Sequence, residues 1–401
     1  MPEPVIVAAA RTPIGRAGKG SLVDFRPDDL AAIAVGAAMA EVPELDPSDV
    51  EDLILGCGLP GGESGFNMGR VVATLLGWET VPGTTVTRYC ASSTQSMRMA
   101  AHAIKAGEGD VFVAAGVETV SRYVNGTSDA GPHNPRFAEA EARTQRVAEE
   151  GADDWTPPEG LPDIYIPMGQ TAENVAVLHG VTRERMDEFA ALSQQRAVES
   201  QGNGFWEREI TPVELPDGTK MTADDGPRPG TTVEKLAELK PVFRPDGRIT
   251  AGNACPLNDG AAAVVVMSDT RAAELGITPL ARIIATGVTA LNPEIMGMGP
   301  VEASKQALAR AGMTIDDVDL VEINEAFAAQ VIPSADELGI GWDRLNVHGG
   351  SIAVGHPFGM TGARIMTTLL NGLQTADKSI GLETMCVGGG QGMAIIVERL
   401  S

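Results

Sequence analysis

The sequence predicts an α/β protein in which strands are covered by helices. Short apolar runs typical of buried strands alternate with helical patterns between residues 5 and 117. This order is typical of a largely parallel sheet with helices on its faces. After about residue 278 the same order of elements returns. At 401 residues the chain is long enough for two or three domains with large cores.

The first elements are a strand, a helix and a second strand. Residues 5–10 form an apolar run that ends at Thr12 and Pro13, which predicts a buried strand followed by a turn. A helix is predicted over residues 27–39. A polar, cap-like segment then leads into a strand at residues 52–56. These elements begin the predicted α/β pattern.

Cys90 lies at the next turn from a strand to a helix. Residues 84–86 predict the end of a strand, and Met97 and Ile104 recur at helical spacing before Gly107. Free amides at a helix N-terminus favour negative charge, so we expect this thiol to ionise more readily than a free thiol of pKa about 8.5. Most cysteines are small buried packing residues. Because Cys90 lies at a strand-to-helix turn, the competing interpretation is that it is a nucleophile.

The later chain repeats the element order of the first half. Strand, helix and strand patterns follow one another over residues 279–326. Aligning Asp52 with Asp319 places Cys90 within one residue of His356. The two halves therefore carry polar side chains at matching turns, as expected of an internal duplication.

An insertion interrupts the first copy. A glycine-led apolar strand at residues 260–266 matches one at residues 392–397, and this match implies extra residues between roughly Thr119 and Thr250. The stretch is rich in Pro, Gly and acidic residues, and Thr182 can cap a helix within it. Such a segment either supplies ligand contacts or elaborates the surface. We predict an N-terminal half at residues 1–118 completed by 251–270, an inserted loop domain at 119–250, and a C-terminal half at 271–401.

Charge and composition exclude several classes of function. The net charge of −24 argues against nucleic acid or an anionic membrane as a partner. No segment approaches the ~18 consecutive apolar residues of a membrane span, and the N-terminal residues lack a secretory pattern. The 4 cysteines and 5 histidines show no metal-ligand spacing, so we expect no metal. Reduced thiols and a cytoplasmic location are the expectation.

Three further segments join a strand end to glycine or to a reactive side chain. They are residues 324–328, beginning with Asn324, residues 346–363, containing His356, and residues 386–392, beginning with Cys386. If the halves pack as the repeat implies, these turns face Cys90 across one sheet edge. A cysteine beside a histidine is an activated nucleophile, and glycine amides can bind an oxyanion.

Each of these residues also has a structural interpretation. His356 could be a core histidine, Asn324 a turn former and Cys386 a packing residue. The glycine run that follows Cys386 lacks the spacing of a Walker or dinucleotide motif. His348 and His102 are interpreted as structural.

Together, these segments resemble the signatures of the thiolase family (acetyl-CoA acyltransferases) along essentially the whole chain. The resemblance rests on the Cys90 turn and on the segments VIVAAARTPIGR, MGQTAENVA, GNACPLNDGAAA, NEAFA, GGSIAVGHPFGMTGAR and CVGGGQG. It implies a five-layered αβαβα fold made of two similar halves with an inserted loop domain. It also implies a homodimer or homotetramer.

The resemblance implies catalytic roles for five positions. Cys90 matches the nucleophile, His356 the base that activates it, and Cys386 a second acid and base. Asn324 matches a residue that holds a water beside the enolate oxygen of acetyl-CoA. The backbone amides of Cys90 and Gly388 match a second oxyanion hole.

Coenzyme A is implied as a co-substrate, with no permanently bound cofactor. Arg228 matches a basic contact near the nucleotide portion. Met168, Ala326 and Phe327 match walls of the pantetheine tunnel. Cys255 occupies a position that is serine in many members, and a thiol hydrogen-bonds more weakly than a hydroxyl.

The implied reaction is the CoA-dependent cleavage of a 3-oxoacyl-CoA to acetyl-CoA and a shortened acyl-CoA. Pro167 precedes Met168-Gly169, as in degradative relatives. The segments RYCASS, GCGLPGGESGFN and GNACPLNDG resemble actinobacterial thiolases that shorten steroid side-chain CoA thioesters. The alternatives are a biosynthetic acetoacetyl-CoA thiolase, a decarboxylating ketoacyl synthase, and a non-catalytic acyl-CoA or sterol carrier.

Overall fold

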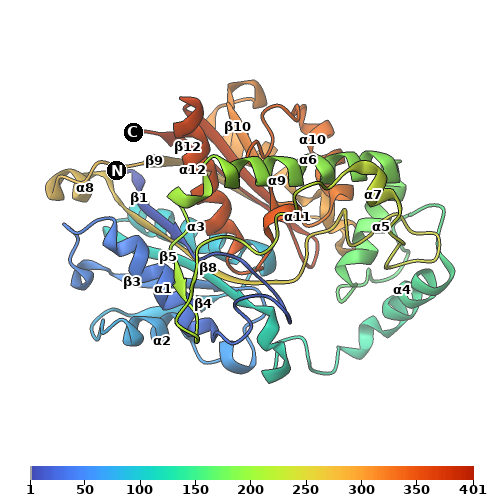
Figure 1. The fold of residues 1–401 in the computed structure, drawn as a ribbon, viewed down its shortest axis with the longest axis horizontal. Helices are drawn as coiled ribbons and strands as arrows, with labels where there is room; N and C mark the ends of the chain where they lie inside the picture. Colours follow the sequence, from blue (N-terminus) through green and yellow to red (C-terminus); the bar gives the residue numbers. More distant parts are fainter. Residues whose placement is uncertain (1) are drawn as a thin grey trace.

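One large sheet runs through the computed structural model, which describes residues 2–401 (Figure 1). Its strands lie in the order β10-β11-β12-β9-β1-β8-β5-β3-β4, and β2 pairs with β8. A separate hairpin is formed by β6 and β7. The strands are β1 (Pro4–Arg11), β2 (Gly15–Arg16), β3 (Asp52–Cys57), β4 (Gly83–Val86), β5 (Val111–Thr119), β6 (Val213–Glu214), β7 (Lys220–Met221), β8 (Asn258–Ser268), β9 (Ala281–Ala290), β10 (Leu320–Ile323), β11 (Ile380–Val387) and β12 (Gln391–Arg399).

The sheet as a whole is mixed, but β3, β4 and β5, the strands on which the expectation of a parallel sheet rests, do pair in parallel. Among the described strands, the parallel pairs are β3–β4, β3–β5 and β10–β11. Strand β8 is antiparallel to β1 and β5, and β12 is antiparallel to β9 and β11. A continuous apolar run is compatible with either direction, because burial on both faces leaves no alternation to read.

The two halves of the sheet share one pattern of pairing. In β3-β5-β8-β1 the successive pairs are parallel, antiparallel and antiparallel. The same succession holds in β10-β11-β12-β9. The halves meet where β1 pairs with β9, Val5 opposite Arg282 and Ile6 opposite Ala281. The residue limits given above for the three domains stay a prediction.

Helices cover the sheet and fill the space between its halves. They are α1 (Pro27–Ala40), α2 (Met68–Leu75), α3 (Ser92–Ala106), α4 (Ala138–Glu150), α5 (Met168–Leu178), α6 (Arg183–Gly202), α7 (Val233–Ala237), α8 (Asp269–Leu275), α9 (Gly299–Ala311), α10 (Ala328–Leu338), α11 (Ser351–Val354) and α12 (Thr361–Ala376). Among residues 2–401, none of these helices combines the length and the apolar character that a membrane crossing requires.

The core is layered because side chains alternate along each strand. Val5 and Val7 of β1 join an apolar cluster with α1, whereas Ile6 joins a second cluster with α3 and α12. The other half-sheet places Ile395 of β12 against α3 and α12, and Ile396 against α9. The layers are therefore α1, sheet, α3 with α12, sheet and α9. This is the five-layered arrangement expected from the resemblance.

The two central helices touch near their N-termini. A Cβ on Gly362 of α12 would lie 2.0 Å from Thr94 Oγ1 of α3, so this approach requires glycine. The amide of Ala363 donates to Ser93 Oγ over 2.9 Å. Because the chain enters α3 from Cys90 and α12 from His356, this contact brings the two preceding turns together.

The stretch between β5 and β8 contains α4 to α7; α4, α5 and α7 lie to one side of the layers, and α6 runs from that side across the main body (Figure 1). The predicted N-cap is confirmed, since Thr182 Oγ1 accepts from the amide of Arg185 over 3.2 Å. Met186, Phe189 and Ala197 of α6 are buried. This helix is therefore packed on the main body along its apolar face.

Candidate active site

Cys90 lies in a single 3₁₀ turn, Tyr89–Ala91, directly before α3. Tyr89 has a left-handed backbone with φ of 44°, which non-glycine residues rarely adopt. The Tyr89 ring packs against the backbone of Gly388, and the Gly388 amide acts to lower the pKa of the Cys90 thiol. Such strain often marks functional turns. Here it turns the thiol toward the end of β11.

The expectation that the Cys90 thiol ionises more readily than a free thiol was wrong. Burial raises the pKa of the Cys90 thiol to about 12, and the Gly388 amide opposes this only in part. Only 7% of Cys90 is exposed, so the loss of water around a thiolate outweighs the helix N-terminus. The sulfur therefore requires a base that removes its proton as it reacts.

His356 is held in one position by its backbone and by one ring nitrogen. Its amide donates to Asn258 Oδ1 over 3.0 Å. Gly355, with φ of 116°, sits so close to Asn258 that a Cβ would lie 2.7 Å from that side chain. The ring Nδ1 lies 2.6 Å from Thr361 Oγ1, whose hydroxyl donates to the carbonyl of Pro357 over 2.8 Å.

These contacts select the tautomer of His356. The Thr361 hydroxyl has one proton and gives it to Pro357, so it accepts from Nδ1–H of the imidazole. The free lone pair is therefore on Nε2. Burial, with the positive charge of Arg364, lowers the pKa of His356 to about 3. The ring is a neutral acceptor that can take a proton at Nε2.

Asn324 faces this lone pair from the end of β10. Its Nδ2 lies 3.2 Å from Nε2 of His356. Its backbone amide donates to the carbonyl of Thr384 over 3.0 Å, and its carbonyl accepts from Gln330 Nε2 over 2.7 Å. Asn324 and His356 are both buried. The fold thus brings together an amide and an imidazole that lie 32 positions apart in the sequence of the second half.

Two further thiols, Cys386 and Cys255, lie near Cys90. Burial raises the pKa of Cys386 well above its usual range, and negative charge on Cys90 or Cys255 raises it further. Negative charge on Cys90 likewise adds to the effect of burial on the pKa of Cys255. The three sulfurs are therefore close enough to influence one another. A buried thiol of high pKa becomes a strong base once it is ionised.

Glu118 connects the turn at Gly58, after β3, with the turn at Gly359, before α12. Sequence reasoning missed this residue. Its carboxylate accepts from the amide of Gly58 over 2.7 Å, from the amide of Gly359 over 2.9 Å and from the hydroxyl of Tyr123 over 3.0 Å. Gly359 follows His356 by three residues. The available signal was a carboxylate near the end of an otherwise apolar strand, since such a group needs several donors when buried.

The predicted CoA contacts fall into two groups. Arg228 lines a cavity together with Arg16, Leu239, Gly252 and Pro256. Pro256, which follows Cys255 in the chain, is the member of this lining nearest in sequence to a thiol. Arg16 was missed, although it belongs to the N-terminal motif VIVAAARTPIGR.

The second group lies in the apolar cluster that contains Cys386. Ala326 and Phe327 belong to this cluster, Met168 packs against it, and the carbonyl of Ala326 accepts from the amide of Cys255 over 3.0 Å. The ring of Phe243 lies across that of Phe327, with centroids 6.3 Å apart.

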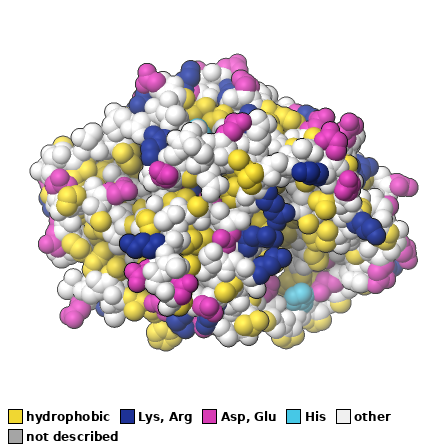
Figure 2. Space-filling view, in the orientation of Figure 1, with side chains coloured by type: hydrophobic (Ala, Val, Ile, Leu, Met, Phe, Trp, Pro, Cys, Tyr) yellow, Lys and Arg dark blue, Asp and Glu magenta, His cyan; other side chains and the backbone are white. Residues whose placement is uncertain are grey.

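Despite the net charge of −24, one face of the molecule carries a group of Lys and Arg side chains beside a hollow (Figure 2).

Comparison with known proteins agrees with this architecture. Residues 4–270 match the thiolase N-terminal domain, and residues 277–399 match the thiolase C-terminal domain. The chain is 43% identical to a beta-ketoadipyl-CoA thiolase of Acinetobacter baylyi, with 100% of both chains covered.

Solved structures give the same result. The Bacillus anthracis acetyl-CoA acetyltransferase superposes with a TM-score of 0.86 at 37% identity, covering 100% of this chain and 99% of that one. Human mitochondrial 3-ketoacyl-CoA thiolase, solved in complex with CoA, superposes with a TM-score of 0.87 at 35% identity, covering 100% and 98%. The chain therefore belongs to the thiolase family of acyltransferases.

Proposed function

We propose that this chain cleaves 3-oxoacyl-CoA with CoA, through an acyl thioester on Cys90, to give acetyl-CoA and a shortened acyl-CoA. The observations that support the proposal are buried thiols at Cys90 and Cys386 that influence one another, and a buried amide and imidazole pair whose tautomer is fixed. A non-catalytic carrier needs neither feature, and the second thiol supplies an acid that a one-cysteine condensing enzyme lacks.

In the first half-reaction, Nε2 of His356 takes the proton of Cys90 as the sulfur attacks the keto carbon. The amides of Cys90 and Gly388 stabilise the resulting alkoxide. The bond between the α and β carbons then breaks, and its electron pair forms the enolate of acetyl-CoA. Donors at His356 and Asn324, the latter through a water, stabilise the enolate oxygen. Cys386 gives its proton to the α carbon, leaving acyl-Cys90 and a Cys386 thiolate.

In the second half-reaction, the Cys386 thiolate takes the proton of incoming CoA. The CoA sulfur attacks the acyl carbon, the bond to the Cys90 sulfur breaks, and Cys90 recovers its proton from His356. The high pKa of Cys386 suits this role, because its thiolate is a strong base. Protons and electrons balance over the cycle without any other reactant.

The cavity with Arg228 and Arg16 is the proposed entry for CoA. The two arginines supply positive charge for phosphate groups, and Leu239 and Pro256 supply apolar walls toward the thiols. The relative in complex with CoA supports this use of the fold. Changing Arg228 to Gln should raise the KM for CoA about tenfold with little effect on kcat.

The acyl group is proposed to occupy a cavity beside the nucleophile turn. Gly58, Pro60 and Ser128 line this cavity together with Tyr89 and Gln391. The first three are small or rigid side chains that leave room for a bulky acyl group. This supports a degradative role on steroid side-chain CoA thioesters.

Arg88 favours a second class of acyl group, one with a terminal carboxylate. It lines the same cavity, and its described side-chain partners are the neutral oxygens of Gln95, at 3.0 Å, and Gln391, at 2.6 Å. Burial lowers its pKa, and a substrate carboxylate would offset that desolvation. A beta-ketoadipyl group, as in the name of the Acinetobacter relative, ends in such a carboxylate.

Thiolysis rates with a panel of substrates test both parts of the proposal. The panel is acetoacetyl-CoA, a medium-chain 3-oxoacyl-CoA, 3-oxoadipyl-CoA and a steroid 3-oxoacyl-CoA, followed by release of acetyl-CoA. Cleavage of none of them would reject the proposed reaction. If Arg88→Gln slows only the carboxylate-ended substrate, the second class is correct; equal effects on all four reject it.

A further inference from the structure

A buried chain of hydrogen bonds runs from Arg364 to the amide of Asn324. Nη2 of Arg364 donates to Ser351 Oγ over 2.8 Å, and Ser351 Oγ donates to Asn324 Oδ1 over 2.6 Å. Asn324 in turn reaches His356. All three residues before His356 are at least 99% buried, so water does not compete for these contacts.

The chemistry of the donors gives this chain one direction. A guanidinium only donates hydrogen bonds, so the Ser351 oxygen accepts the hydrogen bond from Arg364. The single hydroxyl proton of Ser351 then points to Asn324 and requires an oxygen there. The amide oxygen of Asn324 must face Ser351, and its NH₂ must face His356 and the pocket.

The opposite orientation of the amide would harm the reaction. Its oxygen would then face both the lone pair of His356 and the place where the enolate oxygen develops. Two acceptors would meet without a proton between them, and the NH₂ group that donates to the water beside the enolate oxygen would be turned away. Removing one such donor costs about 10²–10³ in rate in other enzymes.

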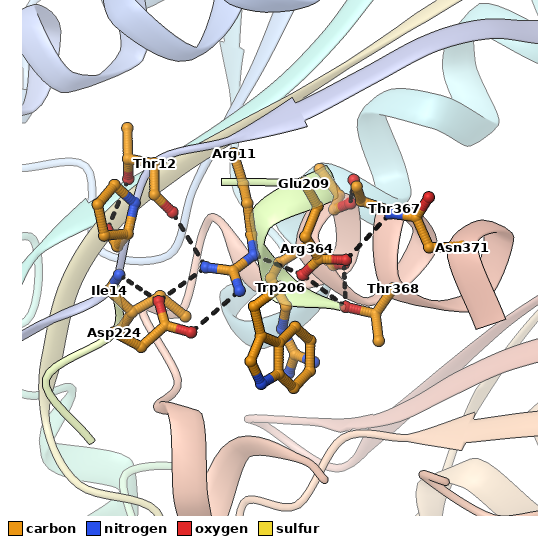
Figure 3. Close-up of polar contacts among 12 residues, drawn as sticks. Arg11, Thr12, Ile14, Trp206, Glu209, Asp224, Arg364, Thr367, Thr368 and Asn371 are labelled. Atoms are coloured by element: carbon orange, nitrogen blue, oxygen red, sulfur yellow. Dashed lines mark hydrogen bonds and ion pairs between the residues drawn. The ribbon is translucent and has the colours of Figure 1, made fainter. Parts of the chain in front are cut away.

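Arg364 is a fixed anchor for this chain. It lies beside the ion pairs of Arg11 with Asp224 and Glu209 (Figure 3). Its Nε and Nη1 have no hydrogen-bond partner among residues 2–401, so the bond to Ser351 is its described polar contact. Breaking the bond to Ser351 would leave the buried guanidinium with another unpaired N–H group, so the free energy of the folded chain favours this bond.

We propose that Ser351, held by Arg364, is a positioning residue that keeps the Asn324 amide turned with its NH₂ toward His356 and the enolate. The proposal rests on the function proposed above. A change at Ser351 should affect the two half-reactions differently, because only enolate formation uses Asn324. Acyl transfer between Cys90 and CoA uses the amides of Cys90 and Gly388 instead.

The test compares two exchange reactions in Ser351→Ala. Entry of solvent deuterium into the methyl group of acetyl-CoA reports on the enolate. Exchange of labelled CoA into acetyl-CoA reports on acyl transfer. We expect the deuterium exchange to fall about 10- to 100-fold and the CoA exchange to fall less than about threefold. Ser351→Cys retains the shape and a weak donor, and should recover part of the deuterium exchange.

Ser304→Ala is the matched control. It removes another buried hydroxyl, one that has no partner among the described residues, and should change neither exchange. Parallel loss of both exchanges in Ser351→Ala would show a structural role, and loss of neither would show no role; both overturn the proposal. If the wild-type protein catalyses neither exchange, the proposed function itself fails.

Discussion

The two sides of the reaction pocket are built in different ways. On the side of Cys90, burial raises the pKa of the thiol to about 12, and the backbone amides of Gly388 and Cys90 oppose this only in part. On the base side, both ring nitrogens of His356 and both side-chain polar atoms of Asn324 have hydrogen-bond partners. The hydrogen bonds of His356 and Asn324 fix where protons are accepted and donated, and the Cys90 thiol, which is less constrained, supplies the reacting sulfur. The difference explains why the proton transfer must accompany the attack.

Removing the nucleophile should have the largest effect. Cys90→Ser should lower thiolysis at least about 10⁴-fold, because a buried hydroxyl is a far weaker nucleophile and leaving group than a thiol. The melting temperature should change little, since the exchange conserves volume. Cys57→Ser, at another buried thiol, is the control for folding and should retain activity. Comparable thiolysis rates for Cys90→Ser and wild type would contradict the role of Cys90 as the nucleophile.

Removing one support of the base should have an intermediate effect. Thr361→Val keeps the shape of the side chain but leaves Nδ1 of His356 without its acceptor. The proton can then move to Nε2, so kcat for thiolysis should fall roughly 10- to 100-fold. Thr367→Val removes a buried hydroxyl from the same helix, whose partner among residues 2–401 is the carbonyl of Ala363. An equal effect of the two substitutions would contradict the assigned tautomer.

Burial of the neutral imidazole should also appear in stability. The pKa of His356 is about 3 in the folded chain and about 6.5 in the unfolded one. The unfolded state therefore binds the extra proton first as the pH falls. The contribution is fully present above about pH 6.5 and is lost progressively toward pH 3.

Urea unfolding of wild type and His356→Gln at pH 8 and pH 5 measures this contribution. Between the two pH values, wild type should lose about 1–2 kcal/mol more unfolding free energy than the variant. The difference between the proteins cancels the other groups that titrate in this range. Identical pH dependence would mean that the imidazole is not held neutral, and the base side would be less fixed than the contacts indicate.

Local pattern was sufficient to predict the turn that holds Cys90. The helix after Cys90 follows from the spacing of its apolar residues and from Gly107, which adopts the left-handed conformation at the helix end. The site residues Asn324 and His356 were named from turns and from the family resemblance. Their contact, across 32 positions of sequence, is a property of the packed halves.

Other features depend on surroundings that no local pattern contains. Ser351, Thr361 and Glu118 matter because of where their polar atoms point, and their residue types are common in many other settings. The pKa of Cys90 follows from burial by several elements, which outweighs the helix N-terminus. The antiparallel directions of β8 and β12 likewise follow from the paths of the connecting segments.

Mass spectrometry of the enzyme after brief mixing with acetyl-CoA tests the central claim most directly. The expected result is one acetyl group per chain, found by proteolysis on the peptide that contains Cys90 and released by added CoA. A protein that stays unlabelled, or one labelled at Cys386 in place of Cys90, would contradict the assignment of the nucleophile.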